Sequence, residues 1–318
     1  PTNQAGSSEV EQASRVEEVP ITAGGEGGRG AGKVLSLCLG ILSMSGIRTL
    51  ERTLASYCNN GLIAAASERL IFFQKHTSGT PLAEWRHSIA RRYGFKVMED
   101  AGNVAYQSFD RMAKECASDF IMFLEEDFVV VENATVVQEQ LENAAWLLTK
   151  GGMDLVRMRH RWKFGSPYYS WSKKHTILTE VLAMTSKLDD PEIGWGHRQS
   201  GTKLFLGDYI TKCVQHPATY CTNSTHARFT TNPAMYRTDW FRKVLGPKMY
   251  MPYIQVEPTI KEWGVWQSGV YKIARPLGLF QHDRLDRSTS EADINQWYRE
   301  HPRDAAPLKC VTSAESGA

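Results

Sequence analysis

The sequence predicts an α/β fold in which helices flank a mostly parallel sheet. Short apolar runs of strand length recur along the first half of the chain, as in residues 34–42 and 120–124. Segments with apolar residues at helical spacing separate these runs. Strands that alternate with helices form a sheet with right-handed crossovers, and such sheets bind ligands at the carboxyl ends of their strands.

The predicted elements follow one another in the first half of the chain. Their strands cover residues 34–42, 70–73, 95–98 and 120–124. The first run is almost entirely apolar, which is typical of a strand buried on both faces. Helices are expected over 48–57, after Asn103 as an N-cap, and from about 137 to the glycines at 151 and 152. Beyond residue 152 the periodicity weakens, and we expect loops and short strands.

Composition sets limits on the domain and its partners. The chain has 318 residues, 42% of them hydrophobic, which is enough for a large core. Its 37 Lys and Arg nearly balance its 35 Asp and Glu, which argues against nucleic acid or a membrane surface as a general partner. Residues 1–32 and 299–318 are expected to be flexible, because they contain few large apolar side chains. A single folded body is expected over 33–298.

Three acids follow the fourth predicted strand directly: Glu125, Glu126 and Asp127. Carboxylates at the end of a buried strand repel one another and are costly to desolvate, so a cation is expected there. Side chains alternate along an extended chain, which predicts Glu125 and Asp127 on one side and Glu126 on the other. A divalent ion that bridges two phosphates needs only one or two carboxylates. The alternative is that these acids cap the strand or begin a turn.

The segment 118–141, with the helix after Asn103, resembles the region of inverting GT-A glycosyltransferases where a helix precedes an acid-x-acid strand. The motif here is Glu125-Glu126-Asp127. The resemblance implies a Rossmann-like GT-A domain with a nucleotide-sugar half over 33–150 and a loop-rich acceptor half over 151–298. It also implies that Asp127 ligates Mn²⁺ or Mg²⁺, and that Glu125 contacts the ribose or a metal-bound water.

Fragments of the second half carry the same resemblance. Residues 278–283 resemble the place where several GT-A families keep a histidine that reaches back to the metal, which implies His282 as a ligand. Residues 256–263 resemble the place where the family keeps an acid at a helix start. Inverting transfer needs a carboxylate base for the acceptor hydroxyl, so Glu257 is the candidate and Glu262 the reserve. Glu257 as a helix-capping acid is the alternative.

Further residues are assigned to the two substrates. Trp263 and Trp266 suit stacking on sugar rings, although tryptophan is also a routine core residue. Asn232 belongs to the segment 231–237, which resembles an acceptor-lining segment of the family. The donor is assigned to Ser43, Ser45, Arg48, Gln74, Asn103, Glu125, Glu126 and Arg284.

Two departures from the family leave the nucleobase open. The family often has an acid after its second strand, where this chain has Gln74 and Lys75, and Asn in its first loop, where this chain has Ser43 to Arg48. The basic segment from Arg157 to Lys163 meets an anionic acceptor or forms the solvated face of a strand.

The sequence therefore predicts a metal-dependent glycosyltransferase. The donor is a nucleotide-sugar, UDP- or GDP-linked, and the acceptor is a hydroxyl of a glycan, glycoprotein or glycolipid. A metal-dependent nucleotidyltransferase and a non-catalytic carbohydrate-binding protein are the alternatives, and nucleic acid is not expected.

Sequons at Asn133 and Asn223 favour a glycoprotein of the Golgi or ER lumen, with the cytoplasm as the alternative. Membrane attachment is expected only through an anchor outside this sequence. Six cysteines without CxxC spacing argue against a structural zinc site. Cys213 and Cys221 form a local disulfide or remain two thiols.

Overall fold

The computed structural model describes fourteen stretches of the chain. They are residues 35–44, 47–74, 79–99, 105–161, 163, 165–166, 211–214, 218–225, 229, 231, 233–249, 265–283, 291–300 and 308–310. The chain divides into two units, Pro1–Ala31 and Gly32–Ala318, and every described residue belongs to the second.

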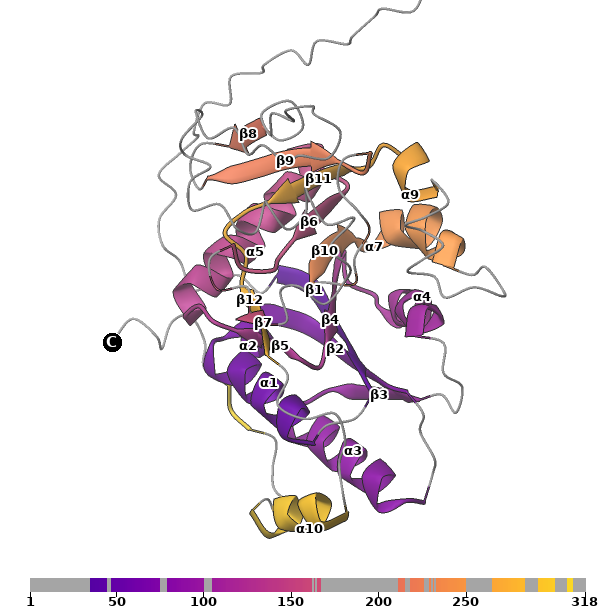
Figure 1. Cartoon of the computed structure of the whole chain (residues 1–318), viewed down its shortest axis with the longest axis vertical. Helices are drawn as coiled ribbons and strands as arrows, with labels where there is room; N and C mark the ends of the chain where they lie inside the picture. The colour runs from indigo at the N-terminus through magenta and orange to yellow at the C-terminus, as the bar shows by residue number, and fades with distance from the viewer. Residues whose placement is uncertain are drawn as a thin grey trace, which may run out of the picture. The chain divides into compact units, whose positions relative to one another are not determined.

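The described residues form a main sheet with the order β3-β2-β1-β4-β10-β6-β11-β9-β8 (Figure 1). From β3 to β8 the strands are Lys96–Glu99, Ala66–Phe73, Leu35–Ser43, Phe120–Glu125, Ala234–Arg237, Leu155–Arg157, Lys272–Arg275, Thr219–Asn223 and Thr211–Val214. Their pairings make β10 and β9 run opposite to the other seven strands. The predicted α/β class with a mostly parallel sheet is confirmed, and the second half of the chain adds strands to the same sheet.

Helices cover both faces of this sheet (Figure 1). The described helices are α1 (Ile47–Asn59), α2 (Leu62–Ala65), α3 (Pro81–Arg92), α4 (Ala105–Glu115), α5 (Ala134–Thr149), α7 (Thr238–Trp240), η2 (Phe241–Leu245), η3 (Gly246–Met249), α9 (Val265–Ser268) and α10 (Glu291–Glu300). Apolar residues of α1, α3 and α5 pack on one face, and those of α4, η2 and α9 pack on the other. Both faces of β1 are therefore buried, as its apolar sequence predicts. None of the described helices is long and apolar enough to span a membrane.

The order in which the strands join the sheet reverses between β1 and β4, which are parallel neighbours. The chain leaves β1 for β2 and β3 on one side, then returns to pair β4 with the other side of β1. Ligands of open α/β sheets bind outside the carboxyl ends of the strands at such a switch point. At this edge lie Ser43, which ends β1, Glu125, which ends β4, and Gln74, which follows β2.

A small second sheet places the strand β12, from late in the chain, at the same edge. Its order is β5-β12-β7, with β5 at Phe128–Val130, β12 at Phe280–Asp283 and β7 at Gly165–Ser166. The antiparallel register of β12 and β5 places His282 opposite Phe128. Because Phe128 follows Asp127 directly, this register places His282 next to the acidic triplet.

Local signals fix both ends of α5, which begins at Ala134, three residues before the predicted start. The side chain of Asn133 accepts a hydrogen bond from the Val136 N–H at 3.0 Å, an N-cap for the first turn. At the other end Gly152 has φ of 68°, a left-handed conformation that glycine adopts at low cost. The predicted end of this helix at Gly151 and Gly152 is confirmed.

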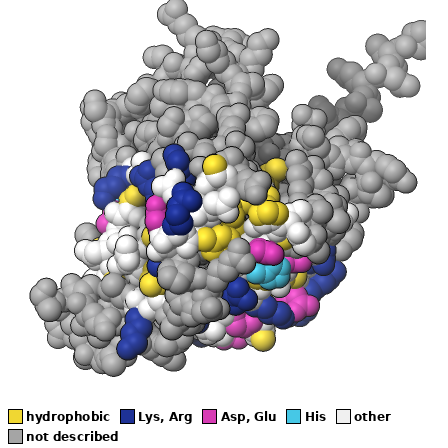
Figure 2. Space-filling model, turned by 90° about the horizontal axis from the view of Figure 1, so that it is seen from below, with side chains coloured by type: hydrophobic (Ala, Val, Ile, Leu, Met, Phe, Trp, Pro, Cys, Tyr) yellow, Lys and Arg dark blue, Asp and Glu magenta, His cyan; other side chains and the backbone are white. Residues whose placement is uncertain are grey.

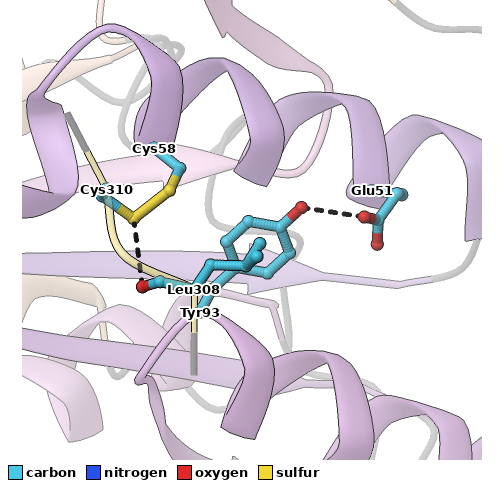
Figure 3. The surroundings of a disulfide bond; sticks show 5 residues. All are labelled: Glu51, Cys58, Tyr93, Leu308 and Cys310. Atoms are coloured by element: carbon cyan, nitrogen blue, oxygen red, sulfur yellow. Dashed lines mark hydrogen bonds between the residues drawn. A yellow bond between two sulfur atoms is a disulfide. The ribbon is translucent and has the colours of Figure 1, made fainter. Parts of the chain in front are cut away.

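The described end of the chain is covalently attached to the domain. Cys310 forms a disulfide with Cys58 of α1 (Figure 3). The Leu308 N–H donates to the Arg92 carbonyl at 2.9 Å. A flexible tail is expected from residue 299, but these two contacts attach residues 308–310 to α1 and α3. Of the two alternatives for Cys213 and Cys221, the structure has the disulfide.

We expect Gly278→Ala to destabilise the fold strongly. Gly278 has φ of +80°, and an added Cβ would lie 2.4 Å from the Arg159 carbonyl oxygen. A left-handed alanine costs about 1–2 kcal/mol, and the overpacking should add about 1–3 kcal/mol to the loss in unfolding free energy. The control is Gly152→Ala, with φ of +68° and no atom within 4 Å of the added Cβ. Guanidinium unfolding measures both, and equal losses would refute the clash.

Candidate functional site

The strand β4 ends at Glu125, and Glu126 and Asp127 form a turn that leads into β5. The Glu126 N–H donates to the Leu42 carbonyl at 3.1 Å, and the Thr53 hydroxyl donates to the Glu126 carbonyl at 2.6 Å. The turn is thus held by β1 and α1. The predicted alternation of the three acids does not apply, because the chain is no longer extended after Glu125.

The carboxylate of Glu126 is hydrogen-bonded to Ser43 and lies near the charge of Arg86. The Ser43 hydroxyl donates to its Oε2 at 2.6 Å. Arg86 of α3, only 2% exposed, donates to the Gln74 carbonyl at 2.9 Å and to the Met44 carbonyl. Burial lowers the pKa of Arg86, and the nearby charge of Glu126 opposes that shift. Arg86 therefore joins the carboxyl ends of β1 and β2 and compensates part of the negative charge of the triplet.

Asp127 and His282 meet at the end of β4. The distance from Asp127 Oδ2 to His282 Nε2 is 3.1 Å, with Asp127 0% and His282 15% exposed. The Asp283 N–H donates to the Asp127 carbonyl at 2.7 Å, which fixes β12 beside the turn. The His282 ring packs edge-on against Phe128, with 5.0 Å between ring centroids. The structure thus brings together two predicted metal ligands that are distant in the sequence.

The helix α1 contacts the residues next to this pair, Phe128 and Asp283. The buried Tyr57 hydroxyl donates to the Phe128 carbonyl at 2.7 Å. Burial raises the pKa of Tyr57 well above its usual value, and the charge of Asp127 raises it further. The phenol therefore stays protonated at neutral pH. Arg52, also on α1, forms an ion pair with Asp283 at 2.5 Å.

The Asp127 and His282 pair fits a divalent cation. Two neighbouring ligands at about 2.1 Å from one octahedral ion lie about 3 Å apart, and the two atoms here are 3.1 Å apart. A carboxylate oxygen and an imidazole nitrogen are both ligands that Mn²⁺ accepts. Glu125 does not join them in a group of three close donors among the described residues. Two protein ligands leave the remaining positions to phosphate oxygens and water.

Gln74 presents a buried amide at the carboxyl end of β2. The backbone N–H of Gln74 donates to the Ser43 carbonyl at 2.9 Å, which places Gln74 beside β1. The side chain is 1% exposed, and neither its oxygen nor its nitrogen is hydrogen-bonded within the described residues. A buried amide without such bonds is costly, so the group favours a ligand that offers both a donor and an acceptor.

The remaining assigned residues divide into three groups. Arg48 is exposed in the first turn of α1, which follows β1. Trp266 is 1% exposed and packs against Phe229 and Tyr271, so its assignment to the acceptor is wrong: both neighbours are core rings that leave no face for a sugar. The others lie outside the described residues: Ser45, Asn103, Asn232, Glu257, Glu262, Trp263 and Arg284.

The basic segment from Arg157 to Lys163 begins at the end of β6, and its described residues are mostly buried, although Lys163 is exposed. Arg157 is 7% exposed, and burial lowers its pKa to about 10. His160 is 2% exposed, and burial lowers its pKa as well. Its Nδ1 accepts from the Lys163 N–H at 2.9 Å, and its Nε2 lies 3.0 Å from a Glu132 carboxylate oxygen. Arg157 and His160 therefore belong to the interior, whereas Lys163 lies at the surface.

Surface charge is mixed on the side of the molecule seen in Figure 2. Basic, acidic and histidine side chains lie interspersed on its described part, without a large patch of one sign. An electrostatic site for nucleic acid is a basic patch or stripe, and the described part of this face offers none.

Sequence reasoning missed Arg86 and Tyr57, which hydrogen-bond to backbone carbonyls around the site. Neither belongs to a motif. The one signal for Arg86 is its position on the buried face of α3, beside Trp85 and Ile89, where an unpaired cation would be costly.

Comparisons with known proteins find likeness only among solved structures. No family model and no curated protein matches the sequence. TarS from S. aureus is 10% identical with a TM-score of 0.44, over 83% of this chain and 38% of TarS. TarS 1-349 in complex with UDP-GlcNAc is 12% identical with a TM-score of 0.44, over 82% and 64%. A cytidylyltransferase from Leptospira borgpetersenii is 8% identical with a TM-score of 0.41, over 86% and 99%.

These likenesses are too distant to assign a family or an activity. The chain spans 38% of the length of TarS, and all three TM-scores lie below 0.5. The function is therefore inferred from the geometry of the site itself.

Proposed function

We propose that the protein is a metal-dependent glycosyltransferase that moves a sugar from a nucleotide-diphosphate donor to a hydroxyl acceptor with inversion. The observation that carries the proposal is the pairing of Asp127 with His282 at the carboxyl end of β4. This pair lies beside the reversal between β1 and β4, where sheets of this kind bind ligands.

In this proposal Asp127 and His282 hold Mn²⁺ or Mg²⁺. The bound ion supplies Lewis-acid stabilisation of the departing diphosphate. Asp127 is fully buried, so its interaction with a cation is weakened little by solvent. Ser43 and Arg86 keep the turn in place through Glu126 and the ends of β1 and β2. In this way Ser43 and Arg86 fix the position of the Asp127 carboxylate.

The nucleotide is assigned to the end of β2. The Gln74 amide has a donor and an acceptor for a nucleobase edge or a ribose hydroxyl. Arg48, exposed in the first turn of α1, supplies positive charge for the phosphates. Both uridine and guanosine diphosphates have groups that an amide can recognise, so both are candidate donors.

The residues that we assign to the acceptor lie outside the described ranges. Glu257, with Glu262 in reserve, deprotonates the acceptor hydroxyl, while Asn232 and Trp263 contact the acceptor. We expect Glu257→Gln to bind the donor as the parent does and to lose transfer by about 10²–10⁴-fold. Donor affinity by calorimetry and transfer by product release check this, and unchanged transfer would move the base to Glu262.

His282→Ala should raise the Mn²⁺ concentration needed for half-maximal transfer by about 10- to 100-fold, the range found for groups that support metal ligands. The matched control is His87→Ala. His87 also pairs with a carboxylate, that of Glu99, but on α3. A metal titration of both variants measures the shift, and an unchanged requirement in His282→Ala would leave His282 a structural residue.

The released product tests the function directly. A glycosyltransferase incubated with Mn²⁺, a sugar nucleotide and an acceptor glycan releases a nucleoside diphosphate. A nucleotidyltransferase instead releases pyrophosphate from a nucleoside triphosphate and a sugar phosphate. A carbohydrate-binding protein releases neither, and its glycan affinity does not depend on Mn²⁺. Pyrophosphate release, or no turnover with any sugar nucleotide, would refute the proposal.

An oxidising lumen such as the Golgi or ER is the compartment that we propose. The described residues contain two disulfides, and disulfides persist in oxidising compartments and are rare in the cytosol of most organisms. The sequons at Asn133 and Asn223 suit the same location.

A further inference from the structure

Two cysteine thiols meet between β1 and the end of α4. Cys38 lies on β1 in register with Glu68 of β2, so both side chains are on the same face of the sheet. Cys116 follows α4, which covers that face. The two sulfur atoms and a carboxylate oxygen of Glu68 all lie within 4.8 Å of one another. This cluster is distinct from the Asp127 site at the carboxyl ends of the strands.

The surroundings of the thiols are closed to solvent. Cys38 is 0% and Cys116 is 1% exposed, and both pack in an apolar cluster with Met112 and Ile121. Arg242 seals the end of α4, because its guanidinium donates to the carbonyls of Ala113, Lys114 and Cys116.

The two thiols and the carboxylate could also hold a zinc ion, but the geometry disfavours one. The Glu68 carboxylate already accepts hydrogen bonds from the Ala117 N–H, at 3.1 and 3.0 Å, and from the Ser118 hydroxyl. A structural zinc site needs four ligands, and burial leaves no open side for water to complete three. The positive charge of Arg242 also acts on Cys38, which opposes a second cation.

We propose that Cys38 and Cys116 form a third disulfide in the mature protein. The four other cysteines are already bonded in two pairs, and Cys38 and Cys116 remain, in contact with each other. An environment that keeps two disulfides oxidised also oxidises a pair of adjacent thiols. The bond would join β1 to the C-terminal end of α4.

The oxidation proceeds by exchange with the disulfide of a small molecule or of an exchange enzyme. The Cys116 thiolate attacks one sulfur of that disulfide and expels the other as a thiolate. The Cys38 thiolate then attacks the Cys116 sulfur of the mixed disulfide and expels the second thiolate. The protein thiols lose two electrons, the reagent disulfide becomes two thiols, and the two protons pass to the expelled sulfurs.

The electrostatics support this order of attack. The hydrogen bond with Cys38 lowers the pKa of Cys116, and the same contact, with burial, raises the pKa of Cys38. Cys116 is thus the more readily ionised thiol and the first nucleophile. Because both sulfurs are buried in the closed structure, the exchange takes place late in folding, when the two thiols are in contact but α4 and Arg242 have not yet closed over them.

Peptide mapping of the full chain, produced in a bacterial periplasm, tests the proposal. The chain is unfolded in guanidinium with N-ethylmaleimide, digested with trypsin without reduction, and analysed by mass spectrometry. Trypsin puts Cys38 in residues 34–48 and Cys116 in residues 115–150. Cys58 and Cys310 fall in residues 53–69 and 310–318, whose linkage is the internal reference for an oxidised sample.

We expect residues 34–48 linked to 115–150 and no alkylated cysteine. Cys38→Ser and Cys116→Ser should each leave one alkylatable thiol per chain, on the surviving partner. Alkylation of both Cys38 and Cys116 in molecules with the reference linkage would overturn the proposal. Zinc released from the native chain by a thiol reagent would overturn it as well, because the thiols would then hold a metal.

Discussion

Asp127→Asn is expected to lower sugar transfer by about 10²–10³-fold, the scale for losing one electrostatic contact to the transition state. The amide has nearly the shape of the carboxylate and can still hydrogen-bond with His282, 3.1 Å away. It lacks the negative charge that a divalent cation needs. The thermal midpoint should change little, because asparagine has nearly the same size as aspartate and keeps its packing contacts. Transfer rate and thermal midpoint are measured on the same preparation.

A buried aspartate elsewhere provides the control for this variant. Asp110 of α4 is 2% exposed and pairs with Lys114 at 2.6 Å, on the opposite face of the sheet from α1. Asp110→Asn removes a buried charge without touching the proposed site, so its transfer rate per folded molecule should match the parent. If Asp127→Asn retained parental transfer, the proposed role of this carboxylate would be wrong.

Removing the Cys58–Cys310 disulfide should give a large loss of stability. The bond joins residues 252 positions apart. A cross-link that closes so long a loop strongly restricts the unfolded chain, and losing a native disulfide typically costs about 2–5 kcal/mol. For a chain of this size each kcal/mol lowers the thermal midpoint by roughly 2–4 °C. Calorimetry of the double variant Cys58→Ser and Cys310→Ser measures the effect.

The second disulfide supplies the matched comparison. Cys213 and Cys221 are separated by 8 positions, so this bond closes a short loop and restricts the unfolded chain less. The double variant Cys213→Ser and Cys221→Ser should therefore lose less stability. An equal or greater loss there would show that loop length does not determine the stabilisation in this protein.

The parallel core of the sheet could be predicted from the sequence because its signals are local. The runs at 34–42, 70–73, 95–98 and 120–124 correspond to β1, β2, β3 and β4, with ends that agree or are shifted by up to four residues. A strand buried on both faces requires a continuous apolar run, and little else in a soluble domain does. The helix caps at Asn133 and Gly152 are local in the same sense.

The insertion of β10 between β4 and β6 could not be predicted, because strand pairing depends on contacts between residues far apart in the chain. The same holds for Arg86, whose partners Gln74 and Met44 come from other elements. Trp266 illustrates the converse error, since an aromatic residue suited to a sugar also suits a core.

The acidic triplet was found because a buried strand rarely ends in three acids. The turn at Glu126 and the register of β12 with β5 determine which of the three acids contacts His282. Neither can be predicted from the motif alone. The Cys58–Cys310 pair was missed for a similar reason, because connectivity cannot be read from spacing.

Calorimetric binding of UDP and GDP, with and without Mn²⁺, is the most direct test of the cation at Asp127 and His282. We predict that one of the two nucleotides binds the parent protein only with Mn²⁺. We also predict that Asp127→Asn loses this Mn²⁺-dependent affinity while Asp110→Asn keeps it. Affinity for neither nucleotide, affinity that is equal without the metal, or affinity that survives in Asp127→Asn would contradict the account.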